Sequence, residues 1–130
     1  MIEYHLDTRS GVSPYLQLVQ QTRQALRLGM LQVGDQLPTV KDVVARIAVN
    51  PNTVLKAYRE LEHEGLVAAR PGVGTFVTRT LADGSLAAHA ELRKDLRRWL
   101  AKARLAGLDE ESIEALFRDT FRSVANQDIA

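Results

Sequence analysis

The sequence predicts a mainly α-helical fold with one small β-hairpin: an N-terminal winged helix-turn-helix followed by a short helical dimerisation region. Two short amphipathic segments are separated by only a few residues around 48–50, which is the spacing of a helix-turn-helix. Directly after them, two short apolar runs flank a glycine-containing loop at 71–74, a pattern typical of a β-hairpin. We therefore expect a winged helix-turn-helix domain over 1–80 and a two-helix region over 81–130, with a polar turn at 80–85 between them.

Composition restricts the class of protein. The chain has 130 residues, of which 45% are hydrophobic and 25% charged, as is ordinary for a folded globular protein. It contains no cysteine, which excludes disulfides and thiolate metal sites. No signal peptide or membrane-spanning apolar run is visible, so we expect a cytoplasmic protein without a membrane partner. The formal net charge is only +1, so a role in binding nucleic acid must depend on where the charges lie.

The first helix is expected to begin at Pro14, because proline fits the first helical turn and Ser13 can cap it. Apolar residues then recur at three- and four-residue intervals, which predicts one buried helical face. Gly29 or Gly34 is expected to end this segment.

The next two segments predict the helix-turn-helix itself. Thr39 is the expected N-cap of its first helix, with Asp42 placed as in a capping box. Asn50 and Pro51 are expected to begin its second helix, as cap and first helical residue. Both helices have apolar residues at i, i+3, i+4 and i+7, and Gly65 ends the second.

The wing is predicted from two strands, at 66–70 and 75–78. The loop between them contains Gly72 and Gly74, which allow the backbone to approach DNA closely. Because a strand rather than a helix follows these glycines, they do not predict a nucleotide-binding loop.

Polar side chains near the start of the second helix suit DNA recognition. Recognition helices reach base edges mainly with their N-terminal residues. Asparagine can pair with adenine, and lysine or arginine can reach guanine or phosphate. The start of the preceding helix adds free N–H groups that favour a phosphate. The candidate DNA-binding residues are Thr39, Lys41, Asn50, Asn52, Thr53, Lys56, Arg59, Arg70, Gly72, Gly74 and Thr75.

Three glutamates lie later on the same helix, and their charge would repel phosphate. We therefore expect Glu60, Glu62 and Glu64 to be turned away from the duplex. Each of these features alone has a plainer explanation, as a solvated face, a helix cap or a hairpin turn. In this order and at this spacing they favour a DNA-binding winged helix.

An ordered set of motifs spans residues 12–78. It comprises Pro14-Tyr15-Leu16-Gln17, Gly29-Met-Leu-Gln-Val-Gly-Asp35, Gln36-Leu-Pro-Thr-Val-Lys41, Val49-Asn-Pro-Asn-Thr-Val54, Lys56-Ala-Tyr58, Leu61-Glu-His-Glu-Gly65 and Arg70-Pro-Gly-Val-Gly-Thr-Phe-Val77. In this order the motifs resemble the GntR family of bacterial regulators and, within it, the YtrA-like subfamily, whose C-terminal part is likewise short and helical.

The resemblance implies a homodimeric repressor that binds a palindromic operator and responds to an unknown small-molecule effector. It also implies that Lys41, polar residues of the recognition helix and the glycine wing tip contact DNA. YtrA-like members often regulate transporter operons. Many relatives have arginine at the position of Lys41, and many in other subfamilies have arginine at that of Pro51. The single ammonium of Lys41 lacks the bidentate geometry of arginine. Pro51 is a trait of the subfamily and implies an altered operator preference, with DNA binding retained.

Two further helices are expected after residue 85, with Asp109 as the cap of the second. Each has an apolar stripe, and a lone helical pair cannot bury both stripes, so they mark an interface. The alternative is that both stripes pack on the winged-helix domain. We favour a dimer, because the two-fold symmetry of an operator usually mirrors the two-fold symmetry of the protein that binds it. The candidate interface residues are Leu92, Leu96, Trp99, Leu100, Ile113, Leu116, Phe117 and Phe121.

Other functions have weaker support. His5, His63 and His89 lie in no metal-ligand spacing and no catalytic motif is present, so we expect no enzyme, metal or cofactor. A winged helix that binds a protein instead of DNA is the alternative that the low net charge favours. RNA binding lacks an aromatic stacking platform. Two short helices can hardly enclose an effector alone.

Overall fold

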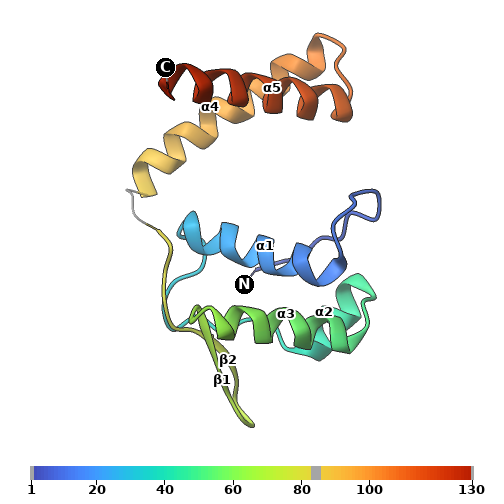
Figure 1. Cartoon of the computed structure of the whole chain (residues 1–130), viewed down its shortest axis with the longest axis vertical. Coiled ribbons are helices and arrows are strands. Elements are labelled where there is room, and N and C mark those ends of the chain that lie inside the picture. Colours follow the sequence, from blue (N-terminus) through green and yellow to red (C-terminus); the bar gives the residue numbers. More distant parts are fainter. Residues whose placement is uncertain (1, 83–85, 130) are drawn as a thin grey trace. The chain divides into compact units, whose positions relative to one another are not determined.

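The computed structural model describes residues 2–82 and 86–129. The chain divides into two compact units, Met1–Leu86 and Ala87–Ala130 (Figure 1). The turn predicted at 80–85 falls partly outside the described residues, because these do not include 83–85.

The first helix, α1, spans Pro14–Arg27 and begins at the proline that predicted it. Ser13 occupies the N-cap position, but its side chain makes no capping hydrogen bond, contrary to expectation. The face toward the core buries Leu18, Val19 and Leu26 completely. Gly29 follows the helix with φ +73°, a backbone conformation that favours glycine.

The second helix, α2, spans Val40–Ile47. Thr39 caps it as predicted, because its Oγ1 accepts a hydrogen bond from the backbone N–H of Asp42 at 3.1 Å. Ala48 ends it in a left-handed conformation with φ +52°. This conformation makes the tight turn of the helix-turn-helix, and it strains an alanine because of the Cβ.

The third helix, α3, spans Pro51–His63. Asn50 caps it, because its Oδ1 accepts a hydrogen bond from the N–H of Asn52 at 2.8 Å. The apolar positions predicted from periodicity, Val54, Ala57, Tyr58 and Leu61, are all buried.

The wing is an antiparallel hairpin of β1, Val67–Arg70, and β2, Gly74–Val77. Both strands lie within the predicted ranges, except that β2 begins at Gly74. The segment 34–37 runs along the outer edge of β2. Gly34 donates its N–H to the Val77 carbonyl at 2.9 Å, and Leu37 donates to that of Thr75 at 2.9 Å. The hairpin is therefore tied to the body of the unit along a whole strand.

The core of the first unit lies between α1, α2, α3 and the base of the hairpin. Two tyrosine hydroxyls are satisfied within it. Tyr58 donates to the Pro38 carbonyl at 2.6 Å, and the Tyr4 hydroxyl lies 2.8 Å from the Thr22 hydroxyl. Burial raises the pKa of both tyrosines. The Tyr58 bond joins the recognition helix to the turn before α2, so it fixes the two helices of the motif to each other.

The second unit is a helical hairpin of α4, Leu86–Leu105, and α5, Glu110–Ile129. Asp109 caps α5 as predicted, because its Oδ1 accepts a hydrogen bond from the Ser112 N–H at 2.8 Å. Ala103 and Ile113 are the buried hydrophobic residues among the described part of this unit. Such a small buried core leaves most apolar side chains of the hairpin exposed.

Candidate nucleic-acid interface

The recognition helix α3 presents a buried side, an outer face and two flanks. Because residues three and four apart share a side of a helix, Asn52, Lys56 and Arg59 lie along the outer face. All three are exposed. Lys56 is displaced toward one flank and Arg59 toward the other, so the two cations border the face.

The first flank of α3 lies against α1, and the two helices are side by side (Figure 1). The Lys56 Nζ lies over the ring of Tyr15, 3.9 Å from its centroid. Two turns further along, Arg23 of α1 pairs with Glu64 of α3, with a hydrogen bond from Nε of 3.1 Å. The two contacts show that the helices run in the same direction.

The second flank of α3 borders a hollow of about 320 Å³ that separates it from the start of α2 and the hairpin. Four of the predicted DNA-binding residues line this hollow: Thr39, Arg59, Gly74 and Thr75. The structure thus brings together residues from three elements that lie far apart in the sequence.

Glu62 also lines this hollow, together with Leu55. The expectation that Glu62 is turned away from the duplex does not match this position, because Glu62 shares the hollow with four candidate DNA-binding residues. It lies three residues after Arg59 and seven after Leu55, a spacing that places all three on one side of a helix. Glu64 is directed to Arg23 on the opposite flank, as its pairing shows.

Two predicted DNA-binding side chains also hold helix termini. Oδ1 of Asn50 and Oγ1 of Thr39 accept capping hydrogen bonds from the backbone. The amide nitrogen of Asn50 and the hydroxyl proton of Thr39 remain as donors toward a ligand. Lys41 follows in the first turn of α2 and is exposed.

The wing tip consists of a tight backbone turn and an arginine, Arg70, that packs on an aromatic ring. Val73 donates its N–H to the Arg70 carbonyl at 2.9 Å, which closes the loop. The Arg70 guanidinium lies over the ring of Phe76, with the Cζ 4.8 Å from the centroid. Gly72 is exposed at the tip, as a close approach to DNA requires.

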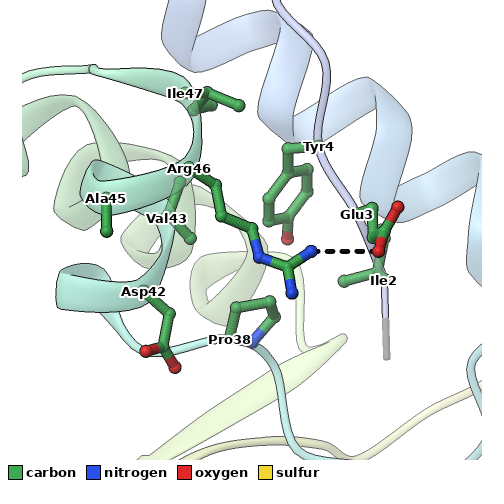
Figure 2. A pocket seen from close by; sticks show the side chains of 9 residues that line it. All are labelled: Ile2, Glu3, Tyr4, Pro38, Asp42, Val43, Ala45, Arg46 and Ile47. Atoms are coloured by element: carbon green, nitrogen blue, oxygen red, sulfur yellow. Dashed lines mark hydrogen bonds and ion pairs between the residues drawn. The ribbon is translucent and has the colours of Figure 1, made fainter.

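A second hollow of about 410 Å³ lies between α2 and the N-terminal segment, and its lining includes none of the predicted DNA-binding residues. Figure 2 shows the Arg46 side chain reaching from α2 to Glu3 across this hollow. The two groups form an ion pair of 2.9 Å. Gln21 holds the same segment on α1 by exchanging hydrogen bonds with the backbone of His5, at 2.9 and 2.6 Å. The N-terminal segment is thus part of the folded unit.

The predicted interface residues of the second unit are mostly exposed. Leu92 is 65% and Phe121 67% exposed, and the Phe117 and Phe121 rings stack with centroids 6.1 Å apart. Ile113 differs, since only 8% of it is exposed within this hairpin. It lines a hollow with Leu96 and Leu100 of α4 and has little exposed surface left for a partner.

Sequence reasoning missed the contacts that support these side chains. Tyr15, Gln36 and Phe76 were part of family-like motifs but had no assigned role. Their roles depend on which elements pack together, and no local pattern reports that. Glu62 is different, because its spacing from Arg59 was available in the sequence.

Among residues 2–82 and 86–129, no group of three or more His, Asp or Glu side chains is placed to hold a metal ion. The helices within these same ranges include no candidate for a membrane span.

A helix-turn-helix followed by a strand-supported hairpin is the architecture of a winged-helix DNA-binding protein. The chain belongs to the GntR family: the family model described as "Bacterial regulatory proteins, gntR family" matches residues 14–77. The chain is 32% identical over 118 residues to the HTH-type transcriptional repressor YtrA of Bacillus subtilis, covering 88% of each chain. This similarity extends beyond the winged helix into the C-terminal helices.

Solved structures have the same architecture. A Listeria monocytogenes protein described as a transcriptional antiterminator is 32% identical with a TM-score of 0.56, covering 92% of this chain and 90% of that one. YtrA from Sulfolobus acidocaldarius, described as a GntR-family transcription factor, is 25% identical with a TM-score of 0.54, covering 95% and 99%. The AraR DNA-binding domain in complex with operator ORX1 is 22% identical with a TM-score of 0.53, covering 59% and 96%. This last likeness shows the fold alone.

Proposed function

We propose that this protein is a homodimeric transcriptional repressor that binds a palindromic operator through α3, the start of α2 and the wing. The observation that carries the proposal is the convergence of polar and cationic side chains from three elements around α3. Asn52, Lys56 and Arg59 suit base edges and phosphates, and Thr39 and Thr75 border the adjacent hollow. The cytoplasm is the compartment that such a partner implies.

The relatives support this proposal. YtrA of Bacillus subtilis is named a transcriptional repressor, and the AraR domain was solved with operator DNA.

The charge of the protein bears on how specific its DNA binding is. Glu62 in the hollow and the low net charge do not favour attachment to DNA of any sequence. They fit a protein whose binding depends on particular contacts, because phosphate attraction alone supplies the sequence-independent part of the affinity.

The exposed apolar stripes of α4 and α5 support a homodimer. Leu92, Leu116 and Phe121 are large apolar side chains that this hairpin leaves exposed. A second copy of the same hairpin covers such a surface in a two-fold arrangement. Two recognition helices related by that axis then read the two halves of a palindrome. A small-molecule effector that alters this arrangement, and control of a transporter operon, are parts of the proposal that rest on the resemblance to YtrA-like regulators alone.

The test is a titration against double-stranded DNA at several salt concentrations. The DNA is a fragment that the wild-type protein selects from a random pool, and unselected duplexes are the reference. We expect preferential binding that weakens steeply with salt. Lys41→Ala and Lys56→Ala should each lower the salt slope by about one unit for each phosphate that the lysine neutralised. Lys102→Ala, which removes an exposed lysine of α4, is the matched control.

Unchanged affinity in both lysine variants would contradict the assigned site. A pool from which no duplex is enriched would contradict the repressor itself. In that case the alternative, a winged helix that recognises a protein partner, becomes the better interpretation.

A further inference from the structure

We propose that Tyr15 is a positioning residue for Lys56, whose ammonium its ring holds at the edge of the DNA-binding face. This inference rests on the proposed function. The observation behind it is that the Lys56 Nζ lies 3.9 Å from the centroid of the Tyr15 ring. Nothing in the local sequence of α3 predicts this contact, because Tyr15 belongs to the first turn of α1.

The chemistry of the support distinguishes Lys56 from the other cation on the same flank. Arg23 is paired with the carboxylate of Glu64, so its charge is compensated by an opposite charge. An aromatic ring attracts a cation through its quadrupole and carries no net charge. Lys56 therefore keeps its full positive charge, and donors that do not face the ring remain available for a phosphate.

The position of the contact suits the geometry of a helix in the major groove. The centre of the outer face of α3 meets base edges, and its flanks face the phosphates that border the groove. Lys56 lies one turn after Asn52 on the α1 side, opposite the hollow that Arg59 and Thr75 line. Lys56 and Arg59 are thus placed toward the two opposite strands of phosphates.

Holding the lysine in place reduces the cost of binding. A free lysine side chain loses much rotamer freedom when it is fixed at an interface. The Tyr15 ring restricts Lys56 before DNA arrives, so less freedom remains to be lost. Arg70 in the wing repeats the arrangement, since its guanidinium lies over the Phe76 ring at 4.8 Å. Two cations of the candidate face therefore rest on neutral rings from neighbouring segments.

A double-mutant cycle in the full-length chain tests the inference. The variants are Tyr15→Leu, Tyr15→Phe, Lys56→Ala and Tyr15→Leu/Lys56→Ala, each titrated against the duplex that the wild-type protein selects. We expect Tyr15→Leu to weaken binding by about two- to fivefold, the effect of removing an exposed cation–π interaction. Tyr15→Phe keeps the ring and should retain wild-type affinity. Tyr15→Leu should cause no further loss in the Lys56→Ala background.

The salt dependence separates positioning from direct contact. Lys56→Ala should lower the salt slope, and Tyr15→Leu should leave it unchanged, because the lysine still reaches the phosphate. An equal loss from Tyr15→Leu in both backgrounds would overturn the inference, since the ring would then act on the fold. Tighter binding by Tyr15→Leu would also overturn it, because the ring would be holding Lys56 away from DNA. Weaker DNA binding by Tyr15→Phe would also overturn the inference, because it would show that the Tyr15 hydroxyl, and not the ring, supports binding.

The cycle also distinguishes the failure of this inference from the failure of the proposed function. If Lys56→Ala weakens binding and Tyr15→Leu does not, the DNA-binding role of Lys56 stands and the positioning role of Tyr15 falls. If Lys56→Ala has no effect on binding, the assigned DNA site fails together with the inference. Thermal unfolding of each variant shows whether Tyr15→Leu still folds. If it does not, Tyr15→Met, which also removes the ring, takes its place in the cycle.

Discussion

Gly74 of the wing lies directly against the side chain of Gln36. A Cβ at position 74 would clash with the Gln36 Nε2 and lie 3.2 Å from its Cδ. The same glycine has φ +146°, a conformation that essentially only glycine adopts. Gly74 therefore serves both the hairpin backbone and the close passage of the 34–37 segment along β2.

Gly74→Ala should destabilise the wing more than Gly72→Ala does. Gly72 also has a positive φ, of +75°, but a Cβ there would meet nothing within 4 Å. We expect Gly72→Ala to lower the free energy of unfolding by about 1 kcal/mol, from backbone strain alone. Gly74→Ala meets a backbone strain of about 1–3 kcal/mol, and the exposed end of the Gln36 side chain must also move aside. Denaturant unfolding measures both variants, and equal losses would contradict the greater backbone strain at position 74.

Glu62→Gln should strengthen DNA binding. Glu62 lines the hollow beside α3 with Arg59, so its carboxylate lies close to where phosphates would pass. Removing one like charge should raise affinity by about fivefold at low salt, and less at high salt because of screening. Glu91→Gln, an exposed glutamate of α4, is the control and should change affinity little. Weaker binding by Glu62→Gln would indicate that the carboxylate orients Arg59 or accepts a hydrogen bond from a base.

Asn50 is expected to act as both a cap and a DNA contact, and two substitutions separate these roles. Asn50→Ala removes the hydrogen bond to the Asn52 N–H and should cost about 1 kcal/mol of stability. Asn50→Ser keeps a capping oxygen and should restore most of that stability. Because serine lacks the amide nitrogen, it should still bind the selected duplex more weakly than the wild type. If Asn50→Ser binds the selected duplex with wild-type affinity, Asn50 acts only as the cap of α3 and does not contact DNA.

The sequence predicted the elements of the first unit well because their signals are local. Thr39 and Asn50 each cap a helix through a backbone N–H two or three residues away, and such a pattern can be read within one segment. The contacts of Lys56 with Tyr15 and of Gly74 with Gln36 join segments far apart in the chain. These two contacts depend on how the elements pack against one another, so they cannot be predicted from hydrophobic periodicity or capping residues.

Two expectations about the first unit differ from the structure, one for a reason that the sequence contains and one for a reason that it does not. The expectation for Glu62 considered its place along the helix and not its angle around the axis, which its spacing from Arg59 determines. Ser13 was expected to cap α1 with its side chain. Its backbone carbonyl accepts the first helical bond, from the Gln17 N–H at 3.1 Å, but the hydroxyl makes no capping bond. Residue type at an N-cap position does not guarantee the rotamer.

The cap of α5 should make the stability of the second unit depend on pH. The hydrogen bonds from Ser112 lower the pKa of the Asp109 carboxyl below its ordinary value. A group with a lowered pKa in the folded state stabilises the fold above its unfolded pKa. That stabilisation is lost as the pH falls through the folded pKa. Helicity followed by circular dichroism under acid titration checks this. Asp109→Asn keeps a capping oxygen and should remove this part of the pH dependence.

The last prediction concerns the apolar surface of α4 and α5. Phe121 is exposed and stacks on Phe117, so Phe121→Ser removes apolar area from the surface without opening the contact between the helices. We expect the dimer to dissociate at higher concentration than the wild type, as measured by sedimentation over a dilution series. Binding to the selected palindrome should weaken when the dimer dissociates, because the second recognition helix is then no longer held next to its half of the palindrome.

Ile113→Ser provides the contrast, since Ile113 is buried between α4 and α5. It should lower the stability of the hairpin itself by about 2–4 kcal/mol, because it leaves a cavity and buries a hydroxyl. If the two stripes instead pack on the winged-helix unit, Phe121→Ser would lower the unfolding temperature and leave the molecular mass unchanged. A dimer that is lost without a change in that temperature would establish the exposed phenylalanine as part of the interface between copies.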